Sequence, residues 1–276
     1  MVKIVTDSTA DVPPDLAPEV TVVPCFVEFG ASSYLDGVDI TREQFYARLN
    51  ATSVMPKTAA PGVGVFEETY RRAAGDADEL IALHAASTLS SLVHTAKLAA
   101  RMVAPERIAV FDSETVSMGL GWLSIAAARA AQQGMSRENI LELLDEMKTR
   151  AHIFAATDTL EFLRRSGRVG WASAMMGQVL NIKPIISLYR GVVKLIDRVR
   201  TRNRSVERLI ELASGLGPLE SLAVLHTTAY DAAVQLAQRL AFLAPPPIPV
   251  VEVTPVVGSH VGPNGLGLAV IVKRQT

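Results

Sequence analysis

The chain has 276 residues, of which 49% are hydrophobic and 20% charged, and this composition predicts a folded protein with a large core rather than a disordered one. Its 27 basic and 28 acidic residues nearly cancel, which argues against a general attraction to nucleic acid or to an anionic membrane surface. The only cysteine is Cys25, so no intrachain disulfide can form, and we expect a reducing cytoplasm as the compartment.

The first 150 residues alternate between short apolar strands and helices. We expect strands over 2–6, 21–27, 80–84 and 108–111, and helices over 41–49, 62–74, 117–133 and 136–150, with a further Ala-rich helix that ends at 102. Thr41 and Gln44 have the spacing of a capping box. Residues 1–6 lack the layout of a signal peptide, and no apolar stretch approaches the roughly 18 residues of a membrane span, so we expect no stable membrane insertion.

Strands that alternate with helices are typical of parallel βαβ units, so this half is expected to form a Rossmann-like α/β layer. Three of its strands are followed by hydroxyl and acidic side chains, in the segments 7–9, 87–90 and 112–113. Ligands of open parallel sheets lie outside the carboxyl ends of the strands. The sequence therefore predicts a polar site at that edge.

The second half has a different pattern. Apolar strands over 182–188 and 192–199 flank the turn 189–191, which predicts a hairpin and thus antiparallel pairing. Helices are expected over 205–213 and 229–242, and strands over 222–225, 250–253 and 267–273. We therefore expect two domains, a Rossmann-like domain over 1–150 and a mixed-sheet α/β domain over 151–276.

Three clusters of small polar residues are candidates for anion binding: the segment 6–9, Lys57 and Thr58 together with Ser87 and Ser90, and the glycine-rich segment 258–265. Hydroxyls that precede helices, together with unpaired backbone N–H groups, suit a carboxylate or a phosphate. For any one of these serines taken alone, plain helix capping is the favoured explanation. His260 is expected in a glycine-rich loop, where its imidazole can donate to an anion.

Motifs for catalysis are missing from the sequence. It contains no G-x-S-x-G elbow, no phosphate loop and no dinucleotide fingerprint, and Cys25 is expected inside an apolar strand. The histidines lack the spacing of metal ligands, so we expect neither a metal nor a cofactor. Basic residues at 164–168 and at 194–204 form either a solvated face or a docking surface for a phosphate-handling partner; Arg198 and Arg200 are expected to share one face of a strand.

The sequence resembles the DegV family, which includes the fatty-acid-binding subunits of bacterial fatty acid kinase. The matching segments run along almost the whole chain: 5–11, 34–40, 56–58, 112–113, 117–119, 166–169, 180–184, 199–201 and 260–263. Each segment is short, and their order along the chain makes the match specific.

The resemblance implies a two-domain α/β fold that holds a long-chain fatty acid between the domains, without chemistry of its own. It implies that Thr58 and Ser90 fix the carboxylate, that His260 lies near it, and that Arg168 lies close by or faces a kinase. Further candidates for contact with the ligand or a partner are Ser87, Ser91, Arg200 and Gly262. In the family, a separate kinase phosphorylates the bound acid.

The sequence departs from the family pattern at two places. Ser91 and Leu92 stand where the family usually has glycine and threonine, and Asn264 and Gly265 follow Gly262-Pro263 in place of glycine and alanine. The first change puts the geometry around the carboxylate in question. The second is compatible with the loop, since asparagine tolerates left-handed backbone angles.

Two other classes of function are alternatives to lipid binding. A small-molecule transferase could use the same hydroxyl cluster, but it would need a base or a nucleophile. A DNA-binding regulator is disfavoured by the near-neutral charge and by the lack of a helix-turn-helix pattern. We take a monomer as the default state.

Overall fold

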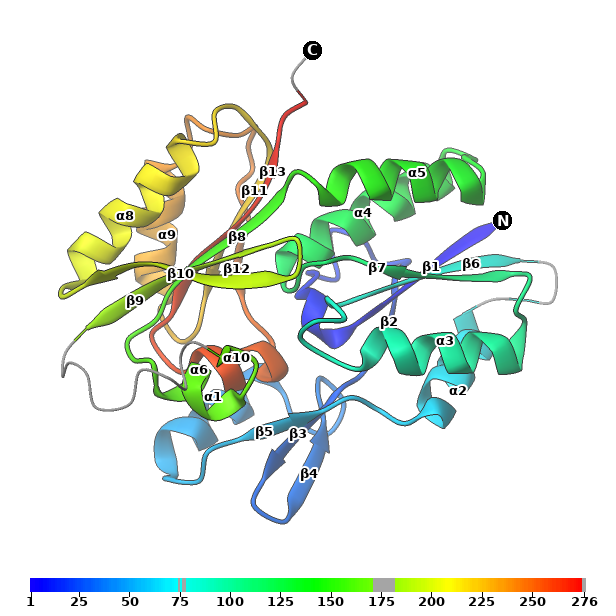
Figure 1. The fold of residues 1–276 in the computed structure, drawn as a ribbon, viewed down its shortest axis with the longest axis horizontal. Coiled ribbons are helices and arrows are strands. Elements are labelled where there is room, and N and C mark those ends of the chain that lie inside the picture. Colours follow the sequence, from blue (N-terminus) through cyan, green and yellow to red (C-terminus); the bar gives the residue numbers. More distant parts are fainter. Residues whose placement is uncertain (74, 76–77, 171–181, 275–276) are drawn as a thin grey trace.

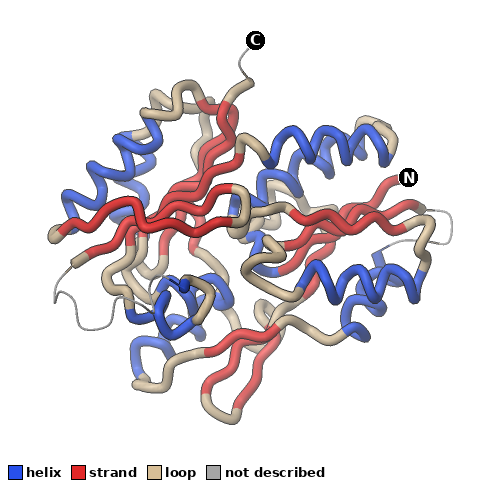
Figure 2. Tube along the Cα trace, viewed as in Figure 1, coloured by secondary structure: helices blue, strands red, loops and turns tan. Residues whose placement is uncertain are grey.

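The computed structural model describes residues 1–73, 75, 78–170 and 182–274, which fold into three sheets with helices packed around them (Figure 1). The two larger sheets lie side by side, and the small third sheet lies below them in the view of Figure 2. Leu180 and Asn181, the first two residues of the matching segment 180–184, lie outside the described residues, as does Ala74.

One sheet is wholly parallel, with strand order β2-β1-β6-β7. Its strands are β1 (Val2–Asp7), β2 (Thr21–Val23), β6 (Glu79–His84) and β7 (Ile108–Asp112). Helices α2 (Val63–Ala73) and α3 (Leu92–Val103) cover one face, and α4 (Met118–Gln132) and α5 (Arg137–Lys148) cover the other (Figure 1). The expected Rossmann-like layer is confirmed. Parallel strands need crossover connections, and the crossover helices bury both faces of the sheet.

The second sheet is mixed, with strand order β10-β9-β8-β13-β11-β12. Its strands are β8 (Ala151–Ala156), β9 (Lys183–Tyr189), β10 (Val192–Val199), β11 (Leu219–His226), β12 (Val250–Glu252) and β13 (Leu266–Val272). Only β11 and β12 pair in parallel; the other neighbours are antiparallel. Helices α8 (Arg202–Ser214) and α9 (Tyr230–Arg239) cover its outer face, so the mixed α/β architecture expected for the second half is confirmed (Figure 1).

Helix α4 packs against both large sheets. Its small residues allow close approach: a Cβ on Gly121 would lie 2.7 Å from the carbonyl oxygen of Ala10. On its other side, Trp122 Nε1 donates to the carbonyl oxygen of Ala269 in β13 at 3.2 Å. One continuous core therefore extends from β1 and β6 through α4 to β11 and β13.

The third sheet, with order β4-β3-β5, is not expected from the sequence. It consists of β3 (Phe26–Phe29), β4 (Ser32–Leu35) and β5 (Lys57–Ala59). The single strand expected over 21–27 is wrong, because the chain leaves the parallel sheet at Pro24 and begins β3 in another sheet. Proline has no N–H to continue a ladder. Cys25 consequently lies between two strands, buried, rather than within one.

Two further expectations about the second half are wrong. No strand is expected over 151–156, because an Ala-rich segment has a low propensity for strands. Strand β8 nevertheless forms there, because it pairs with its neighbours β9 and β13. The segment around His260 is a helix rather than a glycine-rich loop: α10 (Pro255–Val261) begins with proline at its first position and ends at Gly262. Proline is favoured at the first position of a helix.

Local signals predict several other elements well. Thr41 and Gln44 form the expected capping box of α1 (Arg42–Ala51). Ser136 caps α5. The β9–β10 hairpin turns at Arg190 and Gly191, whose φ values of 48° and 74° are those of a type I′ turn. The short helix α6 (Glu161–Ser166), which follows β8, is not among the predicted elements.

Candidate functional site

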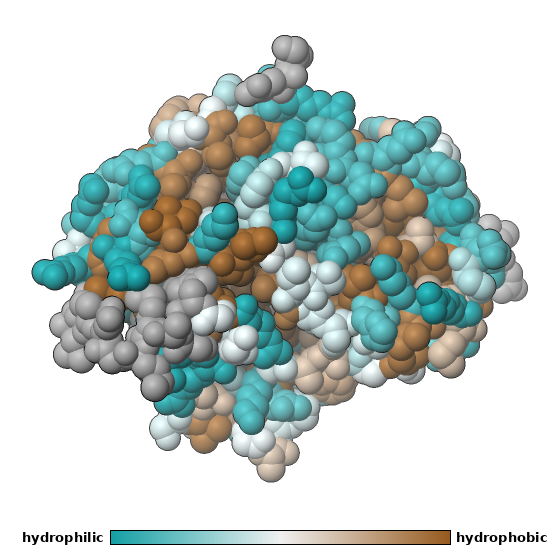
Figure 3. All heavy atoms as spheres, viewed as in Figure 1, coloured by the Kyte–Doolittle hydropathy of each residue, from teal (hydrophilic) through white to brown (hydrophobic). Residues whose placement is uncertain are grey.

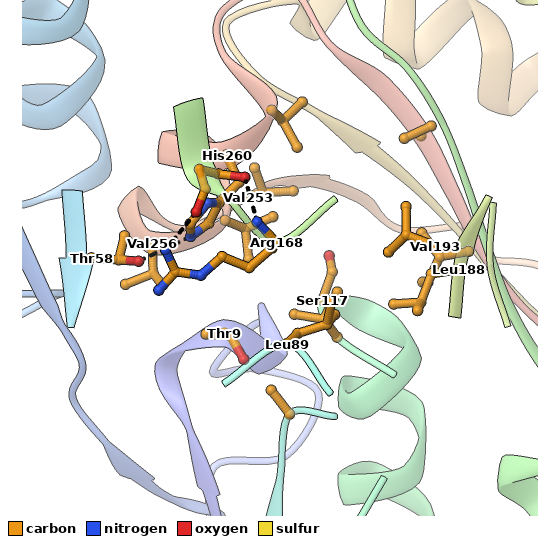
Figure 4. Close-up of a pocket in the computed structure, with 18 of the residues that line it drawn as sticks. Thr9, Thr58, Leu89, Ser117, Arg168, Leu188, Val193, Val253, Val256 and His260 are labelled. Atoms are coloured by element: carbon orange, nitrogen blue, oxygen red, sulfur yellow. Dashed lines mark hydrogen bonds between the residues drawn. The ribbon is translucent and has the colours of Figure 1, made fainter. Parts of the chain in front are cut away.

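A cavity lies where the carboxyl ends of the parallel strands face the mixed sheet. The space open to the centre of a water-sized sphere is ≈ 180 Å³. Its wall is mainly apolar and comes from both halves of the chain, including Leu89, Ile153, Ile186, Leu188, Val193 and Val256. Polar side chains collect at one end, where Thr58, Arg168 and His260 lie together, whereas Leu188 and Val193 lie across the cavity from them (Figure 4).

The position of the cavity follows from the topology of the parallel sheet. Strand β2 lies on one side of β1, and β6 lies on the other. The connections that follow β1 and β6 therefore lead to opposite sides of the sheet, which makes the gap between these two strand ends a topological switch point. Crevices at such switch points are the usual ligand sites of open α/β sheets. Thr9 and Ala85, which follow β1 and β6, both line the cavity.

Asp7 ties these two strand ends together. Its buried carboxylate accepts hydrogen bonds from the backbone N–H and hydroxyl of Thr9, at 3.0 and 2.5 Å. It also accepts from the backbone N–H of Ala85 at 3.1 Å and contacts His84 Nδ1 at 3.0 Å. Asp7 thus links the ends of β1 and β6, and it is not among the residues that line this cavity.

Thr58 and His260 form the polar end of the cavity. Thr58 lies in β5 opposite Val27, and His260 lies in α10; Thr58 Oγ1 is 2.9 Å from His260 Nε2. The buried Nδ1 of His260 has no hydrogen-bond partner among the described residues. Burial lowers the pKa of His260 to about 4, and the Arg168 guanidinium acts in the same direction. The imidazole is therefore neutral at pH 7.

Arg168 follows α6 and brings a positive charge to this end. Its Nη1 donates to the carbonyl oxygen of Ser166 at 2.7 Å, which holds the side chain over the cavity wall (Figure 4). The residue is exposed, so the polar end of the cavity reaches the surface of the protein. An acid bound beside Thr58 and His260 would have a cation close to it.

Ser90 both lines the cavity and supports a helix. Its Oγ accepts from the backbone N–H of Leu92 at 3.3 Å, near the start of α3. The anion-binding and capping interpretations of this serine are thus both compatible with the geometry.

The other candidates lie away from the cavity wall. Ser87 is exposed and its backbone N–H donates to Asp112. Ser91 is exposed at the start of α3 and makes no side-chain cap bond. Arg200 is exposed and follows the end of β10, so the expectation that it shares a strand face with Arg198 is wrong. Gly262 has φ 77°, and a Cβ there would lie 2.3 Å from Phe162 Cδ2. Packing against Phe162 thus accounts for the glycine at this position.

The two departures from the family pattern fit the backbone. Ser91 has φ −79°, so this position does not require glycine. Leu92 is buried and adds an apolar side chain to the cavity wall. Asn264 adopts the left-handed φ of 58° that asparagine tolerates.

Ser117 is a cavity residue that the sequence reasoning did not single out as a site. It precedes α4 with φ 55° and ψ −149°, a strained backbone for a residue other than glycine. Its hydroxyl donates to Asp11 Oδ2, and Asp11 Oδ1 accepts from the Thr254 backbone N–H at 2.7 Å. Residues 117–119 form one of the segments that match the family pattern, and this match could have pointed to Ser117.

The β9–β10 hairpin closes the apolar end. Thr88 Oγ1 donates to the carbonyl oxygen of Gly191 at 2.6 Å, and the N–H of Gly191 donates to the carbonyl oxygen of Glu114 at 2.6 Å. Figure 3 shows hydrophobic surface over the region of β9 and β10. Tyr189 and Val192 of this hairpin are exposed. The hairpin thus docks the mixed sheet onto the loops that follow β6 and β7.

Within the described residues, no group of three or more His, Cys, Asp or Glu side chains is placed to hold a metal ion. In the same part of the chain, no helix has the length and apolar character needed to cross a membrane.

A family model described as "Uncharacterised protein, DegV family" matches residues 1–273. A DegV domain-containing protein of Streptomyces coelicolor is 34% identical over 277 residues, covering 98% of each chain. A solved structure described as fatty acid binding of a DegV family protein from Thermus thermophilus is 31% identical, with a TM-score of 0.90 and 99% of each chain covered. A fatty acid binding DegV protein from Bacillus subtilis is 28% identical, with a TM-score of 0.87 and the same coverage.

Proposed function

The chain belongs to the DegV family, and on that basis we propose that it binds one long-chain fatty acid, with the carboxylate beside Thr58, Ser90 and His260 and the tail along the apolar wall. The observation that carries this proposal is the division of one cavity into a polar end and an apolar remainder. The fatty-acid-binding relatives of the same fold support it.

Tail burial supplies most of the affinity in this proposal. Each buried CH₂ contributes about 0.8 kcal/mol, so a tail of about sixteen carbons offers on the order of 10 kcal/mol before the costs of association. This gain is not specific for an acid. The discrimination between a fatty acid and other lipids must come from the polar end.

The polar end can satisfy a buried carboxylate. If the neutral His260 carries its proton on Nε2, it donates to Thr58 Oγ1 and leaves the threonine hydroxyl hydrogen free for a carboxylate oxygen. Ser90 offers a second hydroxyl, and Arg168 supplies the opposite charge. These donors matter because a carboxylate buried without partners would cancel much of the gain from the tail.

The proposal is tested by purification under native conditions, solvent extraction and mass spectrometry. We expect about one fatty acid per chain. Repeated recovery of lipid-free protein that also fails to bind added fatty acids would rule out the proposal.

We further propose that the bound acid is presented to a separate kinase, which phosphorylates the carboxylate. Two observations support this: the polar end of the cavity reaches the surface at Arg168, and the sequence contains no phosphate loop. With ATP, magnesium and a fatty acid, the protein alone should form no acyl phosphate, and product should form when a fatty acid kinase is added. Acyl phosphate without the kinase, or none with it, would contradict this role.

A transferase that uses the Ser117–Asp11 pair is the second candidate. The pair suggests a nucleophile beside a carboxylate, but both oxygens of Asp11 already accept hydrogen bonds. Among the described residues, no imidazole is bonded to the Ser117 hydroxyl. The pair is better explained as a link between the segment that follows β1 and the start of α4, so lipid binding is preferred.

We also propose that the chain divides near residue 150 into domains 1–150 and 151–276, which both contribute residues to the cavity wall, and that it acts in the cytoplasm. The mixed sheet begins with β8 at Ala151, which supports the division. A single buried cysteine is compatible with a reducing compartment.

A further inference from the structure

A second cavity lies beside the lipid cavity, and the short 3₁₀ helix η1 (Ser8–Ala10) separates the two. Thr9 lines the first cavity, whereas Ser8 and Ala10 line the second, whose volume is ≈ 630 Å³. Its wall includes Thr6, Asp11, Asp36, Arg42, Glu68 and Arg72. Residues of the matching segments 5–11 and 34–40 meet in this second cavity. Of these two segments, Thr9 alone lines the first cavity.

Two buried polar atoms on this wall have no hydrogen-bond partner among the described residues. They are Asp36 Oδ2, in a residue that is 5% exposed, and Thr6 Oγ1, in a residue that is 0% exposed. Buried polar atoms in folded proteins almost always have a partner in the protein, in water or in a ligand. Both residues line the cavity, so a molecule within it can supply the missing hydrogen bonds.

The charges deep in this cavity favour a cation. Asp11 and Asp36 carry carboxyl groups, and the positive charge of Arg42 favours the ionised form of both. Burial raises the pKa of Asp36 to about 7, although the Ser8 hydroxyl, Arg42 and the Val256 N–H group stabilise its charged form. Asp7 also lines the cavity, but its carboxylate is already bonded to Thr9, His84 and Ala85. The carboxyl groups of Asp11 and Asp36, set against the single guanidinium of Arg42, therefore leave room for one further positive charge. At the mouth, Glu68 and Arg72 balance each other.

Asp36 is the carboxyl group that is available to a ligand. Both oxygens of Asp11 are already engaged, by Ser117 and by the Thr254 N–H. No set of three acidic, histidine or cysteine side chains in the described part of the chain is arranged for a metal ion, so an organic cation fits better. A primary ammonium carries three N–H donors and a full charge, which suits a free carboxyl oxygen and a hydroxyl.

We propose that this second cavity is a binding site for a small molecule that bears a primary ammonium group, which donates to Asp36 Oδ2, with the Thr6 hydroxyl as a second acceptor on the wall. The site is separate from the fatty acid cavity, and its existence does not depend on what that cavity binds.

The experiment measures by calorimetry the binding of three amines, putrescine, methylammonium and ethanolamine. The control ligand is 1,4-butanediol, which has the carbon chain of putrescine with hydroxyls in place of both ammonium groups. The full-length protein is used in one defined lipid state. We expect at least one amine to bind and putrescine to bind about tenfold or more tightly than the diol. No binding by any amine, or equal binding of putrescine and the diol, would overturn the proposal.

Variants then locate the site. Asp36→Asn should weaken putrescine binding by about tenfold or more, and Thr6→Val should weaken it to a smaller extent. Asp15→Asn removes the same charge from an exposed carboxylate that does not line the cavity, so it should leave binding unchanged. Unchanged binding in Asp36→Asn, or an equal loss in Asp15→Asn, would contradict the site.

Arg42→Gln gives a readout with the opposite sign, which remains informative if Asp36→Asn fails to fold. Removal of this guanidinium should strengthen putrescine binding, because it removes the repelling charge that faces Asp11 and Asp36. Weaker amine binding in Arg42→Gln, with thermal unfolding unchanged, would show that Arg42 does not repel the bound amine and would reject the proposal.

Discussion

Thr58 Oγ1 and His260 Nε2 lie 2.9 Å apart, although 202 residues separate them in the chain. The contact joins β5 of the small antiparallel sheet to α10 and defines the polar end of the lipid cavity. The predictions below start from this pair and move outward along the cavity.

Thr58 and Ser90 are expected to hold the carboxylate jointly. Thr58→Val or Ser90→Ala should weaken fatty acid binding by about ten- to a hundredfold, because a hydrogen bond to a charged group contributes roughly 1.5–3 kcal/mol. A double-mutant cycle should show coupled losses for the acid and small losses for the matching fatty alcohol. Equal losses for both lipids would instead identify helix support, such as the bond from the Leu92 N–H to Ser90, as the main role.

His260 should make stability depend on pH in the lipid-free protein. Its pKa is lowered from 6.5 to about 4 by burial and by Arg168, so between these pH values the unfolded chain binds more protons than the folded one. The stabilising contribution is complete above pH 6.5 and is lost as the pH falls toward 4, by at most about 3 kcal/mol. Urea unfolding at pH 7 and pH 5 should therefore show a smaller pH dependence in His260→Gln than in the wild type. Identical pH dependence in both proteins would contradict this assignment.

Arg168 should contribute to acid binding through its charge. Arg168→Gln is expected to weaken binding of the fatty acid by about tenfold and to leave binding of its methyl ester nearly unchanged. Arg165→Gln is the matched control, since Arg165 is exposed, pairs with Glu161 and does not line the cavity. The alternative that the resemblance implies, in which Arg168 faces a kinase, is tested separately by coupled turnover at saturating fatty acid. A loss of turnover with unchanged lipid affinity would favour the partner role.

Val193 should limit the length of the tail. It lines the cavity across from Thr58 and His260, next to Leu188 in the β9–β10 hairpin (Figure 4). Val193→Phe should weaken binding of longer saturated acids more than that of shorter ones, because the added ring occupies the space of the terminal carbons. Val192→Phe adds the same ring to the exposed neighbour and should leave the chain-length profile unchanged. A uniform loss across all lengths in Val193→Phe would place the tail elsewhere.

The sequence by itself determined the parallel layer and most helix boundaries, because these depend on local patterns. Apolar runs that alternate with capped helices leave few topologies other than parallel βαβ units. The capping box at Thr41 and the type I′ turn at Arg190–Gly191 need only neighbours along the chain. The resemblance added Thr58, Ser90 and His260 as candidates, and all three line the same cavity.

Only the tertiary structure decided which side chains meet. Strands β3, β4 and β5 span three or four residues each, too short for a period to be visible, and they form because they pair with one another. His260 looked like a loop residue because glycines flank it, yet α10 packs against α6 and carries its imidazole to Thr58. The burial of Asp36 likewise comes from distant segments, because an Asp-Gly turn is locally a surface feature. Contacts of this kind depend on the closure of long loops, which no local sequence pattern encodes.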